Sequence, residues 1–210
     1  MAITSGFYNS VGNDRLYTAE QLSSIFEGLI TDGIYNKVGG ALQVQSAGSG
    51  MTLTVATGRA WLNGAWIKND AVHIIEIESS EVALSRYDAI VLRTDFSDDT
   101  RDGGIYVKKG VASSSPAYPE LTESEYIKEI PIAYVYVGKN VSEITQSNIT
   151  DMRGSANCPW VTAEINAPLA ITAYPLKITF ALASFPNLIW LTLSEVTPSS
   201  PVTPIFIILR

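Results

Sequence analysis

Between residues 40 and 137 the chain alternates apolar and polar residues with a period of two, which is typical of half-buried β-strands. The alternation is clearest in the run Met-Thr-Leu-Thr-Val at 51–55, and turn residues separate the successive runs. Many short strands at this spacing predict a mainly β fold, an antiparallel β-sandwich or barrel-like module. The expected strands are Met51–Val55, Gly58–Leu62, Ala65–Lys68, His73–Glu78, Ala89–Arg93, Ile105–Lys109 and Ile132–Val137.

The dipeptide Asn63-Gly64 lies between two of these strands and is a strong local signal for a two-residue hairpin loop. With such a loop, Leu62 faces Ala65 across the hairpin and Trp61 faces Trp66. We therefore expect the two tryptophans to form a cross-strand pair.

A different period is present near the N-terminus, where apolar residues recur every three or four positions. Thr18 and Gln21 have the spacing of a capping box, and Asp32-Gly33 is a stop signal. These signals predict an N-terminal amphipathic helix over residues 18–31. We expect its apolar stripe to be buried against the β module or a partner subunit; the stripe consists of Leu22, Ile25, Phe26, Leu29 and Ile30.

The composition changes near Cys158, so we expect residues 1–161 to form the β module with its N-terminal helix. Residues 162–210 carry only four of the 35 charged side chains and are predicted to be an apolar C-terminal β subdomain or assembly segment. So small a segment has little interior, and its apolar strands need cover from the module or another subunit. Its expected strands are 176–182, 188–193 and 205–209. The candidate oligomer-interface residues are Phe180, Leu182, Trp190, Leu191, Phe206 and Ile208.

The chain is acidic, with 14 Lys and Arg residues against 21 Asp and Glu residues and a net charge of −7. Phosphate binding needs clustered cations, and no basic run is present, so nucleic acid is not an expected partner. No apolar run reaches the ~20 residues of a membrane-spanning helix, and the first residues lack the pattern of a signal peptide. We therefore expect neither membrane insertion nor a signal peptide.

Few residues offer catalytic or metal chemistry. The single cysteine, Cys158, and the single histidine, His73, cannot supply a disulfide or a structural zinc site. The segment from Asp98 to Gly103 partly has the spacing of a calcium loop, but Lys109 replaces the last ligand. We expect a solvated hairpin loop there. No catalytic, metal-binding or cofactor-binding residue is predicted, and we do not expect an enzyme.

Aromatic residues spread over the expected strands have two interpretations. Packed between strands, their rings contribute to the core and to cross-strand pairs. Exposed along a groove, their flat faces suit the rings of a sugar. Buried rings would therefore favour a scaffold, and an exposed ring-lined groove would favour carbohydrate binding. The residues are Trp61, Trp66, Tyr87, Tyr106, Tyr134 and Tyr136.

Ordered motifs over residues 6–162 carry a family resemblance. They are Gly6–Ser10, Asp14–Gln21, Ile25–Gly33, Gly50–Val55, Thr57–Trp61, Tyr87–Val91, Ile132–Val137 and Ile149–Arg153. Together they resemble tail baseplate structural proteins of bacteriophages and prophages of Gram-positive hosts, close to baseplate upper or fibre-attachment proteins. The resemblance implies a mostly β module, homo-oligomers that are usually trimers, and contacts with other phage tail and baseplate proteins. It also implies synthesis in the bacterial cytoplasm and a place in the virion.

Three functions remain in competition. The leading prediction is a structural assembly protein of a phage tail tip or baseplate, which scaffolds or presents host-recognition components. The alternative is a carbohydrate-binding module that recognises host cell-wall sugars. A hydrolase of the host envelope ranks last, because it needs two carboxylates that face one cleft.

Overall fold

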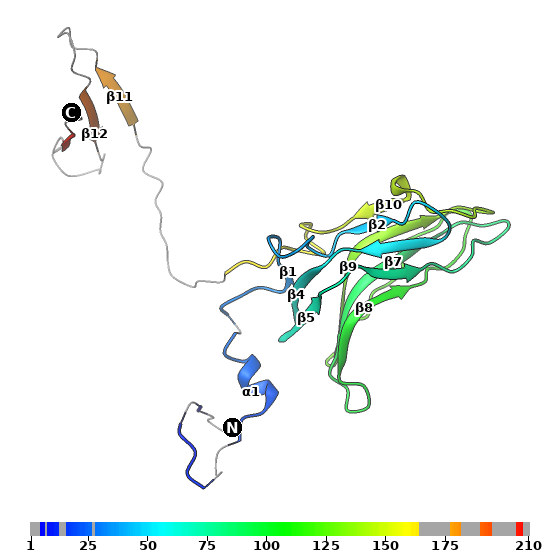
Figure 1. Cartoon of the computed structure of the whole chain (residues 1–210), viewed down its shortest axis with the longest axis horizontal. Helices are drawn as coiled ribbons and strands as arrows, with labels where there is room; N and C mark the ends of the chain where they lie inside the picture. Colours follow the sequence, from blue (N-terminus) through cyan, green and yellow to red (C-terminus); the bar gives the residue numbers. More distant parts are fainter. Residues whose placement is uncertain are drawn as a thin grey trace. The chain divides into compact units, whose positions relative to one another are not determined.

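The computed structural model describes residues 5–6, 8–12, 16–26 and 28–163, together with the backbone of three strands near the C-terminus (Figure 1). The chain divides into two compact units, Met1–Ile165 and Asn166–Arg210.

The first unit is mainly β, as the alternating pattern predicts, and its described strands form three antiparallel sheets. One sheet has the order β1-β4-β5, with strands Gly33–Ile34, Gly58–Leu62 and Ala65–Asn69. The second has the order β2-β3-β6, with strands Val44–Ser46, Thr52–Val55 and His73–Glu76. The third has the order β10-β9-β7-β8, with strands Ile149–Asp151, Ile127–Val137, Arg86–Asp95 and Asp102–Lys108. A short 3-10 helix, η1 (Gln146–Asn148), precedes β10.

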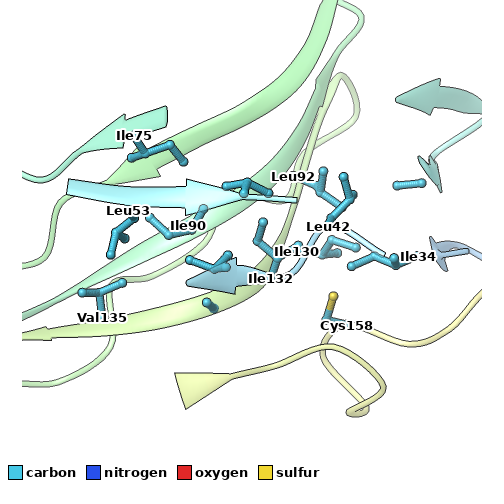
Figure 2. Close-up of a cluster of buried hydrophobic side chains, with 14 of the residues drawn as sticks. Ile34, Leu42, Leu53, Ile75, Ile90, Leu92, Ile130, Ile132, Val135 and Cys158 are labelled. Carbon is cyan, nitrogen blue, oxygen red and sulfur yellow. The ribbon is translucent and has the colours of Figure 1, made fainter. Parts of the chain in front are cut away.

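Side chains from all three sheets form one buried apolar cluster, which gives the unit a sandwich-like core (Figure 2). Leu53 of β3, Leu62 of β4 and Ile90 of β7 are each fully buried. Cys158 is also fully buried in this cluster and therefore behaves as a small apolar residue. Since the central strands β7 and β9 are buried along most of their length, the core follows this strand pair.

The Asn63-Gly64 hairpin is confirmed. In the antiparallel pair β4–β5, Trp61 lies opposite Trp66 and Leu62 lies opposite Ala65. Asn63 and Gly64 have φ values of 50° and 80°, the left-handed backbone that a two-residue loop of this kind requires. The turn chemistry and the alternating burial of the two strands therefore specify the same register.

The predicted N-terminal helix over 18–31 is wrong in its length. Helix α1 spans only Ala19–Ser23, and turns follow it. Its start is as expected, because Gln21 N donates to Thr18 Oγ1 at 3.2 Å and Gln21 Oε1 accepts from Thr18 N at 3.0 Å. Gly28 has φ +74°, a left-handed conformation that an α-helix cannot contain.

Of the two predicted ways to bury the apolar stripe, burial against the β module is wrong, and burial against a partner subunit stays a prediction. Leu22 is 48% exposed, Phe26 44% and Leu29 53%. Segment 16–30, called the arm below, touches the β module at few points: Ser23 Oγ donates to the Gly64 carbonyl at 2.8 Å. Because most of a helix's stability in a protein comes from burying its apolar face, an uncovered stripe explains why the helix stays short.

The β module is closed where the chain enters and leaves it. Thr31 N donates to the Thr162 carbonyl at 2.9 Å, and Val161 N donates to the Ile34 carbonyl at 2.9 Å. Gly33 lies in this clamp with φ +148°, and a Cβ there would lie 2.3 Å from the Pro159 carbonyl oxygen. Only glycine fits so close an approach of the two backbones.

In the second unit, strands β11 (Lys177–Ala181), β12 (Trp190–Ser194) and β13 (Ile205–Ile207) form an antiparallel sheet. Each strand overlaps one of the three runs predicted from the sequence. By register, Phe180 is opposite Leu191 on one face, whereas Trp190 and Phe206 take positions on the other face. The candidate interface residues therefore do not share one face. Leu182 and Ile208 lie outside the described residues.

Candidate functional site

Three edge strands meet around one groove of about 350 Å³. Strands β5, β6 and β8 are each the outermost described strand of their own sheet. Strands β5 and β8 lie side by side (Figure 1). The first residue of β6, His73, also lines the groove. The lining residues are Trp66, Ile67, Lys68, Asn69, His73, Gly103, Gly104 and Ile105. The groove thus combines an aromatic ring, polar side chains and two glycines from separate sheets.

Trp66 is the most prominent side chain of the groove, with 66% of its surface exposed. Its cross-strand partner Trp61 is half-buried and lies against the Phe26 ring of the arm, with ring centroids 5.2 Å apart. The two tryptophans therefore have different environments although they share a face of the hairpin.

The polar groups of the groove are held in different ways. Asn69 Nδ2 donates to the carbonyls of Val55 and Ala56 at 3.3 and 2.9 Å, which fixes the amide and leaves its oxygen as an acceptor. Lys68 Nζ lies 3.6 Å from an Asp70 carboxylate oxygen, so its charge is partly balanced. The His73 side chain is exposed at the start of an edge strand.

Tyr106 lies on β8 beside the groove. Its hydroxyl donates to Asp102 Oδ2 at 2.7 Å, and the Arg93 guanidinium lies 5.9 Å from its ring centroid. The hydrogen bond raises the pKa of Tyr106 and lowers the pKa of Asp102. Because the phenol and the carboxylate stabilise each other, neither is free to transfer a proton readily.

The remaining predicted aromatic residues pack on the outer face of the β7–β9 pair. Tyr134 is buried and stacks on Tyr118, with ring centroids 3.8 Å apart. Tyr87 contacts Tyr118 edge-on at 4.8 Å and Tyr136 at 5.2 Å. These rings therefore have a packing role. The sequence did not single out Tyr118, although its place between Pro116 and Pro119 in the link after β8 is a signal for a fixed loop.

The segment with calcium-loop spacing is the hairpin loop between β7 and β8, as expected. Asp95 accepts from both the amide and the hydroxyl of Ser97, at 3.0 and 2.6 Å, and these bonds lower its pKa. Its other oxygen pairs with Arg93 at 2.5 Å. The carboxylate thus shapes the loop. Among the described residues, no group of three or more His, Cys, Asp or Glu side chains is placed to hold a metal ion.

A buried ion pair that sequence reasoning missed joins Arg86 and Asp88, both only 1% exposed. Arg86 Nε donates to Asp88 at 3.0 Å, and its two other nitrogens donate to the carbonyls of Ser79 and Glu78 at 3.0 and 2.6 Å. Asp88 also accepts from Gly110 N at 2.9 Å. All of these partners belong to the chain itself, and both side chains are buried. The pair therefore holds the neighbouring loops in place and is not accessible to a ligand or substrate.

Burial raises the pKa of the Cys158 thiol to about 12. The thiol therefore stays protonated at neutral pH, and it is a poor nucleophile because the thiolate is the reactive form.

Within the described residues, no helix has both the length and the apolar character needed to cross a membrane.

Comparison with protein-family models, with curated proteins and with solved structures finds no match to this chain.

Proposed function

We propose that the chain is a structural assembly protein of a phage tail tip or baseplate that works as a homo-oligomer, with a trimer favoured. Its role is to scaffold or present host-recognition components in the virion, in contact with other tail proteins. The motifs over residues 6–162 support the family, and the exposed apolar stripe of the arm is the observation that carries the assembly role.

The apolar stripe is exposed to solvent, and contact with another molecule would stabilise it. Leu22, Phe26 and Leu29 each expose between 44% and 53% of their surface. Burying one such side chain completely contributes about 1.5–3 kcal/mol, so the group offers a sizeable driving force for association. Large exposed apolar patches on soluble proteins mark sites where another molecule binds. A second copy of the chain, which carries the same arm, is the occupant that the family resemblance favours.

The way the arm is attached agrees with this role. It is tied to the β module through Ser23 and Gly64 and through the Phe26–Trp61 ring contact. These contacts hold the base of the arm and leave Leu22 and Leu29 exposed. The C-terminal segment is a second candidate surface. Its strands are rich in apolar residues, and Phe180 is opposite Leu191 in the register of β11 and β12.

Light scattering coupled to size-exclusion chromatography tests the proposal. At about 50 µM the full chain is expected to have the mass of an oligomer, since association is concentration-dependent. The double variant Leu22→Asp, Leu29→Asp places charges on the stripe and should lower that mass. A matched control is Val82→Asp, Val111→Asp, because both valines are 82% exposed and lie off the arm. A monomeric full chain at this concentration would refute the assembly role.

A further inference from the structure

We propose that the groove between β5, β6 and β8 binds an uncharged oligosaccharide, with one sugar ring stacked on Trp66. This inference goes beyond the assembly role and does not depend on it. It rests on four independent features of the groove: the exposed ring, the fixed polar groups, the charge balance and the two glycines.

The exposure of Trp66 is unusual for so large an apolar side chain on an ordered strand. Its neighbour across the hairpin, Trp61, is half-buried and contacts the Phe26 ring of the arm. Trp66 instead lies open along a groove of about 350 Å³, within the size range of small-molecule sites. A flat, rigid and exposed ring provides a stacking surface for the apolar face of a pyranose.

Polar groups lie along the same groove at fixed positions. Asn69 lines the groove, and the two hydrogen bonds of its Nδ2 hold the amide in place and leave Oδ1 as a hydrogen-bond acceptor. The exposed His73 imidazole and the Lys68 ammonium add donors. Sites for small molecules combine an apolar surface with a few polar groups that fix orientation, as here.

The charge of the groove favours a neutral ligand. The lining residues, all from the described part of the chain, include no Asp or Glu, and the one lysine is close to Asp70. The chain as a whole carries a net charge of −7, which opposes the approach of an anionic polymer. An uncharged saccharide needs no charged partner in the groove and is not repelled by the negative charge of the chain.

Two adjacent glycines open the β8 side of the groove. Strands disfavour glycine, and packing does not require it here. A Cβ at Gly103 would be 3.6 Å from Ile67 Cγ1, and a Cβ at Gly104 would be 3.4 Å from the Tyr106 ring, so small side chains fit. Their absence leaves backbone accessible to a ligand, which is one of the reasons for glycine within a strand.

An added peptide strand is the other ligand that edge strands attract, and the spacing argues against it. Cα atoms of β5 and β8 approach within 8 Å of each other. A strand inserted between them would hold them about 9.5 Å apart, which is two strand spacings. The groove therefore suits a ligand that lies on the two edges and does not pair between them.

Saturation-transfer NMR and tryptophan fluorescence test the proposal, with chitotriose, maltotriose and cellotriose as probes on the full-length chain. We expect at least one of them to bind below about 10 mM and to lose about tenfold in affinity in Trp66→Ala. The Trp66→Phe variant keeps an aromatic face and should retain most of the binding. Tyr126→Ala is the matched control, because Tyr126 is 52% exposed and lies outside the groove.

Far-ultraviolet circular dichroism of each variant shows whether the fold is intact, and a His73→Ala variant provides a second test should Trp66→Ala unfold. Weaker binding in His73→Ala with an unchanged fold would support the groove. No binding by any of the three sugars, or equal binding by wild type and both groove variants, would overturn the proposal. A response to an extended peptide without any response to the sugars would also overturn it.

Discussion

The arm and the β4–β5 hairpin lie next to each other in space and begin from equally strong local signals, yet they differ in outcome. The hairpin forms with the predicted loop and register, and β5 is one residue longer than predicted. The arm forms its predicted capping box, but its helix ends after Ser23. Local chemistry therefore fixes where an element begins, whereas its extent depends on what it is packed against.

Burial is the difference between the two regions. In the hairpin, Ala60 and Leu62 are fully buried and Ile67 nearly so. Helix α1 has no buried residue. A short helix in water is marginal without tertiary contacts, while a hairpin whose inner face is part of a core is held in place. The comparison predicts that equal substitutions in the two regions will have unequal costs.

The largest expected effect comes from Leu62→Ala. This fully buried side chain belongs to the core, so its removal should lower the free energy of unfolding by about 2–5 kcal/mol. Leu22→Ala, at a dilution where subunits are apart, should cost less than about 0.5 kcal/mol because the side chain is 48% exposed. Urea denaturation measures both. Equal losses would contradict the comparison.

The same measurement at higher protein concentration sharpens this prediction. If the arm is covered by a partner, the cost of Leu22→Ala rises with concentration, because binding adds to the stability of the folded state. The cost of Leu62→Ala stays constant. A Leu22→Ala cost that is independent of concentration would count against the partner.

An intermediate effect is expected at Gly64, the residue that joins the two regions. Alanine there would have to adopt φ +80°, and its Cβ would lie 2.4 Å from Ser23 Oγ of the arm. We expect Gly64→Ala to cost about 1–2 kcal/mol and to release the arm. Gly48→Ala is the control, since it has φ +83° but no atom within 4 Å of its Cβ. Urea denaturation and limited proteolysis of the arm separate backbone strain from loss of the contact; an arm that stays protected in Gly64→Ala would contradict the expectation.

The smallest effect on global stability is expected from Thr18→Ala. The variant removes the acceptor of the Gln21 amide and should destabilise the helix locally by about 0.5–2 kcal/mol. Global unfolding should remain unchanged, because helix α1 contributes no buried residue to the core. Faster hydrogen exchange at the Gln21 amide with the same urea midpoint is the expected result. A shifted midpoint would mean that the arm folds with the core.

Strands could be predicted where the alternation of apolar and polar residues and the turn residues lie within one short segment. The pattern predicts a strand over Ile132–Val137, and the residue before this run, Pro131, cannot donate to a ladder. Strand β9 instead begins at Ile127 and passes through the proline, with a register shift opposite Ile90 and Val91. A bulge of this kind accommodates the missing donor, and the sequence carries no signal for it.

The groove was only partly predictable. Trp66 was named among the ring residues, and its pairing with Trp61 followed from the loop. Its neighbours Asn69, His73 and Gly103 come from three different sheets, and only the packing of those sheets brings them together. Arg86 was missed for another reason: its acceptors Glu78 and Ser79 are near in sequence, but they are backbone carbonyls of the loop before β7, and carbonyls leave no mark in the sequence.

The clamp at the two ends of the β module has a mechanical consequence. The chain enters at Thr31 and leaves at Thr162, and the backbones of these two residues are hydrogen-bonded to each other. A force that pulls the two chain ends apart therefore loads this short clamp first and reaches the sheets only after it has opened. While the clamp holds, the tension passes directly between the two flanking segments through these hydrogen bonds. The core between Ile34 and Val161 then bears little of the force and stays folded.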